Sequence, residues 1–213
     1  MTSDPIRVDI ISDVVCPWCI VGFRQLEQAS RNTGIQIEPY WHPFELNPDM
    51  VPEGENLKEH IMRKYGSTAK QSEDARAHLS TVGAQLNITF NWTEESRIYN
   101  TFKAHQLLHW ASTIGQTHRL KLALFDTYFT DGRDVSDEHV LLDVIDSLGL
   151  DVAKAQTALD GQTYAQEVRK KQFFWTSRGV SGVPTMILGA KQATSGAQGV
   201  EAFTRILTEF AGS

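Results

Sequence analysis

The sequence predicts an α/β fold in which a sheet domain is interrupted by a large all-helical insertion domain. The first 41 residues read as strand, helix and strand, a βαβ unit of ordinary length. From about residue 56 to about residue 155 every periodic segment has helical spacing, and no proline occurs between Pro52 and Pro184. A strand and an amphipathic helix follow. We therefore expect a discontinuous domain, 1–55 with 156–213, around an insertion domain of residues 56–155.

The composition is that of a globular protein. Of the 213 residues 41% are hydrophobic and 22% charged, the net charge is −6, and no run of Lys or Arg stands out. These values argue against a nucleic acid or an anionic membrane as partner. No segment approaches the ~20 apolar residues of a membrane-spanning helix. The first residues lack the basic and apolar regions of a secretory signal, so we expect a cytoplasmic protein.

The N-terminal elements follow from apolar spacing and from the residues that start and stop helices. Residues 6–12 form a predicted strand, and a helix begins at Pro17, which fits a first helical turn. That helix ends near Asn32-Thr33-Gly34. A second strand covers 35–41, and Pro39 places it toward a sheet edge.

The remaining elements are predicted in the same way. Asn56 and Glu59 resemble a capping pair at the start of a helix, and Thr93 or Ser96 starts another that stops at Gly115. Further expected elements are a polar helix to about 83, helices to 131–132, over 136–149 and over 162–178, strands at 185–188 and 192–195, and a final helix with Phe203, Ile206, Leu207 and Phe210 on one side.

The chain has only two cysteines, in the motif Cys16-Pro17-Trp18-Cys19 directly after the first predicted strand. Cys16 falls at the predicted N-cap of a helix, where unpaired N–H groups favour an anion. We therefore expect a lowered pKa for Cys16 and an exposed sulfur that attacks disulfides. Cys19 lies one turn later, should be less exposed, and should resolve the mixed disulfide.

A close cysteine pair can also bind a metal ion. It can be half of a zinc site, and His105 and His109, four apart on a predicted helix, can complete a Cys2His2 set. No second cysteine pair exists, however, and a strand–CxxC–helix order is typical of redox motifs. We therefore expect no metal.

A second motif, Gly182-Val183-Pro184-Thr185, opens a predicted strand. If this strand pairs beside the first one, its leading loop faces the helix N-terminus that carries Cys16. Pro184 has no N–H, and Val183 would then offer its carbonyl and N–H to an incoming peptide as an added strand. The simpler alternative is a loop exit with an ordinary trans bond.

The order of these motifs resembles the DsbA-like branch of the thioredoxin superfamily, and within it the FrnE-type subgroup. The residues that carry the resemblance are Ser12 to Cys19, Phe44-Glu45-Leu46-Asn47-Pro48, Tyr128-Phe129 with Gly132-Arg133, and Gly179 to Thr185. It implies a thioredoxin-like fold with a helical insertion, a redox pair at Cys16 and Cys19, a cis bond before Pro184, and protein disulfides as substrates. This chain departs from strongly oxidising relatives because Trp18 replaces the histidine of their dipeptide, so their redox poise does not carry over.

Three side chains near the motifs have two interpretations each. Asp13 either relays a proton for the thiols or, as we favour, serves the loop as an Asx-turn residue or a helix-start anion. Trp18 either docks substrate or packs on the insertion domain. His42 either lines the cleft or is a plain loop histidine, which we favour.

The predicted function is disulfide exchange with protein or peptide thiols, assisted by a redox recycling partner. No tightly bound cofactor is expected, and glutathione is a candidate thiol co-substrate. One rival is a glutathione-dependent enzyme of the kappa-class transferase or 2-hydroxychromene-2-carboxylate isomerase type, although those relatives usually carry serine at the position of Cys16. The other rival is a peptide-binding chaperone or partner module whose cysteines are incidental.

Overall fold

A computed structural model describes residues 4–212, which divide into two compact units. The first unit comprises residues up to 44 together with 169 onward, and the second comprises 45–168. Residues 55–56 pair with a strand of the second unit, and the helix over 152–160 contacts another helix of that unit. The boundaries that the sequence predicts for the insertion domain, residues 56 and 155, remain a prediction.

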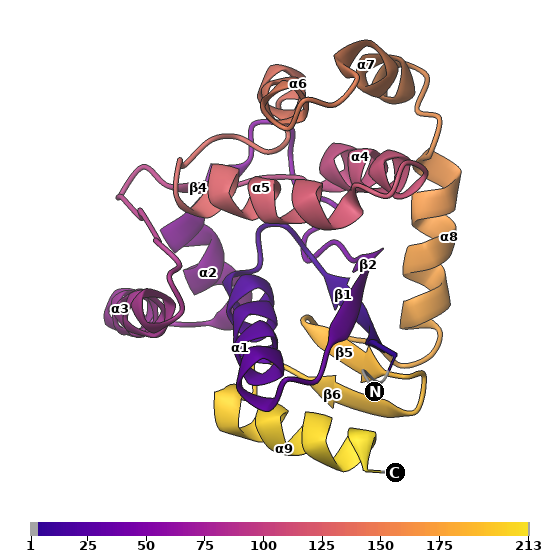
Figure 1. Cartoon of the computed structure of the whole chain (residues 1–213). Coiled ribbons are helices and arrows are strands. Elements are labelled where there is room, and N and C mark those ends of the chain that lie inside the picture. Colours follow the sequence, from indigo (N-terminus) through magenta and orange to yellow (C-terminus); the bar gives the residue numbers. More distant parts are fainter. Residues whose placement is uncertain (1–3, 213) are drawn as a thin grey trace. The chain divides into compact units, whose positions relative to one another are not determined.

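In the described part of the first unit, four strands form one mixed sheet in the order β2-β1-β5-β6 (Figure 1). Strand β1 (Ile6–Ser12) is parallel to β2 (Ile37–Pro43), with Ile6 opposite Ile37 and Ser12 opposite Pro43. It is antiparallel to β5 (Thr185–Leu188), which pairs with β6 (Gln192–Ser195). The predicted pairing of the strand after Pro184 with the first strand is therefore confirmed, as is the edge position of the strand that contains Pro39.

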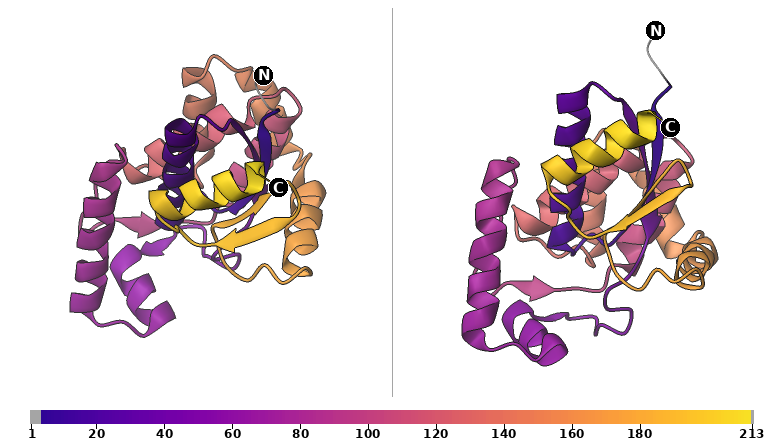
Figure 2. Two further views of the ribbon diagram at one scale, coloured as in Figure 1. Left: turned by 60° about the horizontal axis from the view of Figure 1, so that its bottom comes forward. Right: turned by 90° about the horizontal axis from the view of Figure 1, so that it is seen from below.

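Helices α1 (Pro17–Thr33) and α9 (Val200–Ala211) contact each other in this unit (Figure 2). Phe23 of α1 packs on Trp41 of β2 with ring centres 5.1 Å apart, so α1 covers one face of the sheet. The helix ends where the sequence indicates, because Gly34 adopts φ +72° and its N–H bonds to the Ser30 carbonyl at 2.9 Å. The first strand and helix are predicted closely, whereas the second strand runs two residues later than expected.

The second unit is mainly helical, but it also contains a two-stranded antiparallel sheet that the sequence pattern did not predict. The helix expected to start at Thr93 or Ser96 begins at Phe102 instead, because Arg97 and Ile98 are extended and pair with Asn56 and Glu55. A helix over 152–160 was not predicted. The elements are β3 (Glu55–Asn56), α2 (Leu57–Tyr65), α3 (Ala69–Gln85), β4 (Arg97–Ile98), α4 (Phe102–Ser112), α5 (Thr117–Phe129), α6 (Glu138–Ser147), α7 (Val152–Asp160) and α8 (Ala165–Thr176), which continues into the first unit.

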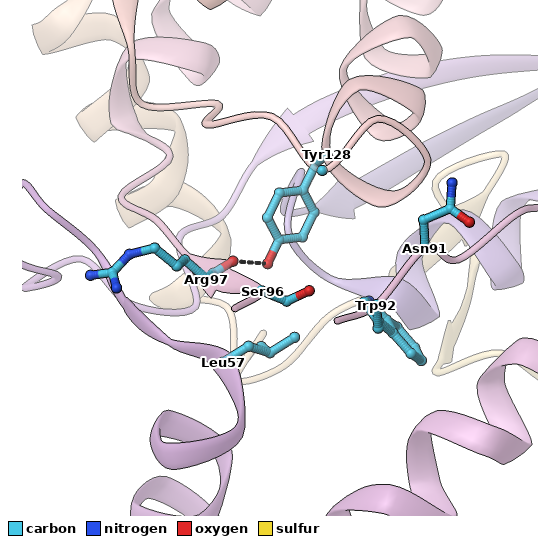
Figure 3. A pocket seen from close by; sticks show the side chains of 7 residues that line it. Leu57, Asn91, Trp92, Ser96, Arg97 and Tyr128 are labelled. Atoms are coloured by element: carbon cyan, nitrogen blue, oxygen red, sulfur yellow. Dashed lines mark hydrogen bonds between the residues drawn. The ribbon is translucent and has the colours of Figure 1, made fainter. Parts of the chain in front are cut away.

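Short polar contacts fix these helices and strands. Asn56 caps α2 as predicted, accepting a hydrogen bond from the Glu59 N–H at 3.1 Å. The Tyr128 hydroxyl donates to the Arg97 carbonyl at 2.9 Å, which ties α5 to β4 (Figure 3). A small pocket beside this bond is lined by Leu57, Asn91, Trp92, Ser96, Arg97, Tyr128 and Gly132. The Tyr128 motif of the sequence therefore has a structural role in this unit.

None of the helices within residues 4–212 is both long enough and apolar enough to cross a membrane.

Candidate active site

The cysteine motif lies where β1 gives way to α1. Cys16 is the N-cap of α1 with an extended backbone, φ −93° and ψ 110°, and Pro17 takes the first helical position. The Cys19 N–H donates to the Cys16 carbonyl at 3.0 Å, which closes the first turn. This local geometry confirms the N-cap prediction. It follows from the sequence, because a strand of apolar residues must stop before Pro17 can start a helix.

Both cysteines are free thiols, and both are buried. Cys16 is 4% exposed and Cys19 0%, so the expectation of an exposed Cys16 is wrong for this conformation. The Cys19 thiol lies close enough to that of Cys16 to affect its pKa. The neighbouring Val14 and Val15 are also buried, at 0% and 4% exposure. The sulfur pair is therefore closed off from bulk water, with Cys19 the deeper of the two, as predicted.

The second motif covers the Cys16 sulfur. The peptide bond between Val183 and Pro184 is cis, as the family resemblance implies. The Cys16 thiol donates to the Val183 carbonyl at a sulfur–oxygen distance of 3.6 Å. The carbonyl expected to be open to a peptide therefore already accepts a hydrogen bond from the Cys16 thiol of the same chain. Residues 167 positions apart meet here because β5 pairs beside β1.

Gly22, one turn beyond Cys19, permits the close approach of this loop to α1. A Cβ atom at Gly22 would lie 3.3 Å from the Pro184 Cγ, 3.3 Å from the Met186 Cε and 3.5 Å from the Ala197 Cα. The sequence pattern alone did not single out Gly22. A lone glycine inside a helical pattern is the signal that could have found it, since such glycines usually serve packing.

The pKa of Cys16 is raised well above its ordinary value, first by its side-chain hydrogen bond with Cys19 and then by burial. The charges of Cys19 and Asp13 act in the same direction, whereas the backbone N–H of Cys19 opposes them. The expected lowering is therefore wrong for the closed, reduced pair. The physical reason is that the helix N-terminus supplies one favourable donor, while burial and the surrounding groups favour the protonated sulfur.

Asp13 and Trp18 flank Cys16 in different surroundings. Asp13 is 1% exposed, and its Oδ1 accepts a hydrogen bond from the Val14 N–H at 2.7 Å, so it has a local role in the loop. Trp18 is 37% exposed at the start of α1. That exposure suits a side chain that meets an incoming substrate.

A polar cluster lies in the same sheet. Asp9 of β1 is buried and accepts hydrogen bonds from Arg7 at 2.7 and 3.0 Å and from His42 Nε2 at 2.7 Å. Burial acts to raise the pKa of Asp9, but these donors outweigh it and leave the pKa lowered. Burial lowers the pKa of His42, and Asp9 opposes it only in part. His42 lies in β2 and not in a loop, because β2 extends to Pro43.

Among the residues that the structure describes, no three His, Cys, Asp or Glu side chains are grouped so that they could hold a metal ion. Cys16 and Cys19 are therefore considered as thiols.

Comparison with known proteins places the chain in a family. Residues 7–208 match the model of the DSBA-like thioredoxin domain. The crystal structure of "probable DsbA oxidoreductase SCO1869" from Streptomyces coelicolor is similar at 30% identity, with a TM-score of 0.89 over 98% of this chain and 91% of that one. The uncharacterized protein YwbO of Bacillus subtilis is 25% identical over 96% of both chains.

More distant structures share the fold. A 2-hydroxychromene-2-carboxylate isomerase is similar with a TM-score of 0.71 at 16% identity, over 96% of both chains. The cytosolic disulfide reductase DsbM of Pseudomonas aeruginosa, solved with glutathione, has a TM-score of 0.68 at 16% identity, over 97% of this chain and all of that one. The family match spans β1 to α9 and includes both motifs. The chain is therefore a member of the DSBA-like thioredoxin domain family, with the thioredoxin fold interrupted by helices that its sequence predicts.

Proposed function

We propose that the chain is a thiol–disulfide oxidoreductase that exchanges disulfides with protein or peptide thiols through Cys16 and Cys19. The observation that carries this proposal is the meeting of three groups. Cys16 caps α1, Cys19 hydrogen-bonds to it from one turn away, and the carbonyl before Pro184 lies 3.6 Å from its sulfur. Trp18, Val183 and Pro184 are the proposed substrate-binding residues.

The reaction follows from ordinary thiol chemistry. Cys16 loses its proton and its thiolate attacks one sulfur of the substrate disulfide, which forms a mixed disulfide and releases the other substrate sulfur as a thiolate. Cys19, once deprotonated, then attacks the Cys16 sulfur. The products are a Cys16–Cys19 disulfide and a second substrate thiolate, and the two released thiolates take up the two protons. The protein has given up two electrons, which a recycling thiol must restore.

The buried starting state gives the substrate a defined part in this sequence. In the closed pair the Val183 carbonyl accepts a hydrogen bond from the Cys16 thiol, so that carbonyl favours the thiol over the thiolate. A peptide strand that pairs with Val183 replaces this bond. The Cys16 sulfur then still interacts with the backbone N–H of Cys19, and this interaction favours the thiolate. Substrate binding and ionisation of the attacking sulfur are coupled in this proposal.

The test is to trap the mixed disulfide. Cys19→Ser should accumulate a covalent adduct between Cys16 and a disulfide-containing peptide, detectable by mass spectrometry, because the resolving sulfur is gone. Cys16→Ser should form no adduct and should lose turnover. Retention of activity by both single variants would contradict the proposal and would favour a binding module with incidental cysteines.

We place this activity in the cytoplasm and propose net reduction or isomerisation there, with glutathione as the recycling thiol. The support is the fold shared with DsbM, which its structure describes as a cytosolic disulfide reductase and shows with glutathione. The equilibrium of the Cys16–Cys19 pair against glutathione tests the direction. A reduction potential far above the poise of the glutathione pool would contradict net reduction.

The fold shared with the chromene-carboxylate isomerase supports one alternative, a glutathione-dependent isomerase or transferase. The two proposals differ in their need for the Cys16 sulfur. Turnover of a chromene carboxylate with glutathione that persists in Cys16→Ser would favour the alternative. Loss of all turnover in that variant would favour disulfide exchange.

A further inference from the structure

Positive charge is concentrated in the part of the chain that leads to the cis proline. Residues 168–200 contain five Lys or Arg and no Asp or Glu, although the whole chain has a net charge of −6. Only three of these five basic residues are consecutive, so the segment is not a continuous run of Lys and Arg. The basic residues of α8 and the turn after it are Arg169, Lys170, Lys171 and Arg178.

Two adjacent aromatic side chains on α8 are exposed among these basic residues. Phe173 is 73% exposed and Phe174 43%. The Arg178 guanidinium carbon lies 3.5 Å from the centre of the Phe174 ring, and its Nη1 donates to the Phe174 carbonyl at 3.1 Å. Lys170, Phe173, Phe174 and Arg178 follow the spacing of one helix side, and we call them the basic aromatic face.

Aromatic contacts connect the basic aromatic face to the sheet. The Trp175 ring lies edge-on to Phe174 with centres 5.0 Å apart, and it packs on His42 at 4.8 Å. His42 is in turn hydrogen-bonded to Asp9 in the central strand at 2.7 Å. The Phe174 ring is therefore connected to the sheet through Trp175 and His42. Rigid aromatic and Arg side chains of this kind dominate the binding energy of protein interfaces.

We propose that the basic aromatic face binds an acidic segment with apolar side chains in the protein whose disulfide is exchanged, a proposal that rests on the function proposed above. Opposite charge selects the acidic segment and accelerates its encounter, and the Phe rings select its apolar side chains. A segment of a protein is favoured over an anionic membrane as the occupant, because the chain after this face leads to the Cys16 sulfur, which reacts with protein disulfides in the proposed function. The chain from Arg178 to Val183 then leads to the Cys16 sulfur, where the disulfide reacts.

The test compares two peptides that contain the same intramolecular disulfide. One carries Asp, Glu and Leu on both flanks, and the other replaces each acid by its amide. The reduced protein is mixed with each peptide, and the rate constant of single-turnover reduction is measured. We expect the acidic peptide to react at least about tenfold faster at low ionic strength. This preference should shrink as salt approaches about 0.5 M, because salt screens exposed charges.

A matched pair of variants locates the effect. Phe173→Ser/Arg178→Gln removes an exposed ring and a cation, and it should slow the acidic peptide about tenfold. The amide peptide keeps its Leu side chains and has no charge to lose, so it should be slowed less, and the preference for the acidic peptide should shrink. Tyr65→Ser/Arg205→Gln makes the same chemical changes on α2 and α9, where Tyr65 is 61% exposed and Arg205 is exposed. This control should retain the preference. Lys170→Gln alone should lower the preference without removing an aromatic ring.

The outcomes separate this inference from the proposed function. Equal rates for the two peptides in the unchanged protein would overturn the inference and leave disulfide exchange intact. Failure to reduce either peptide would overturn the proposed function. The binding inference would still be decided by the fluorescence anisotropy of a cysteine-free acidic peptide. Tighter binding to vesicles of anionic phospholipid than to that peptide, or self-association abolished by Phe173→Ser/Arg178→Gln, would overturn it in favour of a membrane or a second copy.

Discussion

Asp9 and Cys16 are ionisable groups at similar depth near β1, but their surroundings affect them in opposite ways. Asp9 is 5% exposed and Cys16 is 4% exposed. Burial disfavours the charged form of both. Nevertheless the pKa of Asp9 is lowered, because Arg7 and His42 donate hydrogen bonds to it. The pKa of Cys16 is raised, because its hydrogen bond with Cys19 and its burial act together.

The difference shows that hydrogen-bond partners can either outweigh the effect of burial on a pKa, as at Asp9, or add to it, as at Cys16. Asp9 is satisfied as an anion and holds β1 and β2 together through His42. Cys16 donates a hydrogen bond to the Val183 carbonyl and is satisfied as a neutral thiol. The first arrangement favours the folded sheet, and in the function that we propose the second keeps the thiol protonated until a substrate displaces the carbonyl.

The largest expected effect concerns the reactive member of this comparison. Cys16→Ser should lower the rate of disulfide exchange at least about 1,000-fold, because a hydroxyl cannot form the mixed disulfide. Stability in urea should change little, since serine is nearly the same size. Glu38→Gln, on the exposed part of β2, is a suitable control and should keep most of the activity.

The second prediction removes the ionised member. Asp9→Asn should lower the free energy of unfolding by about 2–3 kcal/mol, the usual worth of hydrogen bonds to a charged group. Urea denaturation measures this loss. Glu38→Gln, on the exposed part of β2, should cost much less. A loss no larger than that of Glu38→Gln would mean that the Asp9 cluster does not stabilise the sheet.

The third prediction concerns the packing of Pro184 and Met186 against Gly22, next to the cysteine pair. Gly22→Ala forces the Pro184 and Met186 side chains to move by a few tenths of an ångström, and overpacking of this kind costs about 1–2 kcal/mol. We expect both a lower unfolding free energy and faster alkylation of Cys16 than in the unchanged protein. Unchanged alkylation with reduced stability would show that the loop does not protect the sulfur.

The fourth prediction concerns the thiol of the unchanged protein. Because its pKa is raised, Cys16 should be less ionised than free cysteine at about pH 7 and should react more slowly with iodoacetamide. A bound peptide that lacks cysteine should speed this alkylation, because it displaces the Val183 carbonyl from the thiol. Mass spectrometry of the labelled protein measures both rates. Alkylation faster than that of free cysteine without peptide would contradict the closed state.

The smallest effect is the pH dependence of the Asp9 cluster. The folded pKa of His42 is lowered, so the unfolded chain takes up the proton first. Its contribution to stability is present above the unfolded pKa of about 6.5 and is lost as pH falls through the folded pKa. The lowered pKa of Asp9 gives a contribution that is present above about 3.9 and lost at still lower pH. His42→Gln should remove the first step in urea unfolding measured against pH, and Asp9→Asn the second.

The sequence predicted well those helices and strands whose start or end depends on residues adjacent in the chain. The strand 6–12, the helix start at Pro17, the stop at Gly34 and the Asn56 cap each depend on local sterics or a local hydrogen bond. The strand at 97–98 was misread as helix, because its extended form is imposed by pairing with residues 55–56. The role of Gly22 was missed for the same reason, since its neighbours come from the far end of the chain.

The sequence by itself determined that two cysteines share the first turn of a helix, and that a proline opens a strand able to pair beside it. Strand pattern, N-cap position and spacing are properties of adjacent residues, so they could be read directly. Only the tertiary structure decided that Cys16 is buried, that its pKa is raised and that its thiol donates a hydrogen bond to Val183. The burial that helps to raise its pKa is a result of packing, and the carbonyl that accepts its hydrogen bond belongs to a segment 167 residues away in the chain.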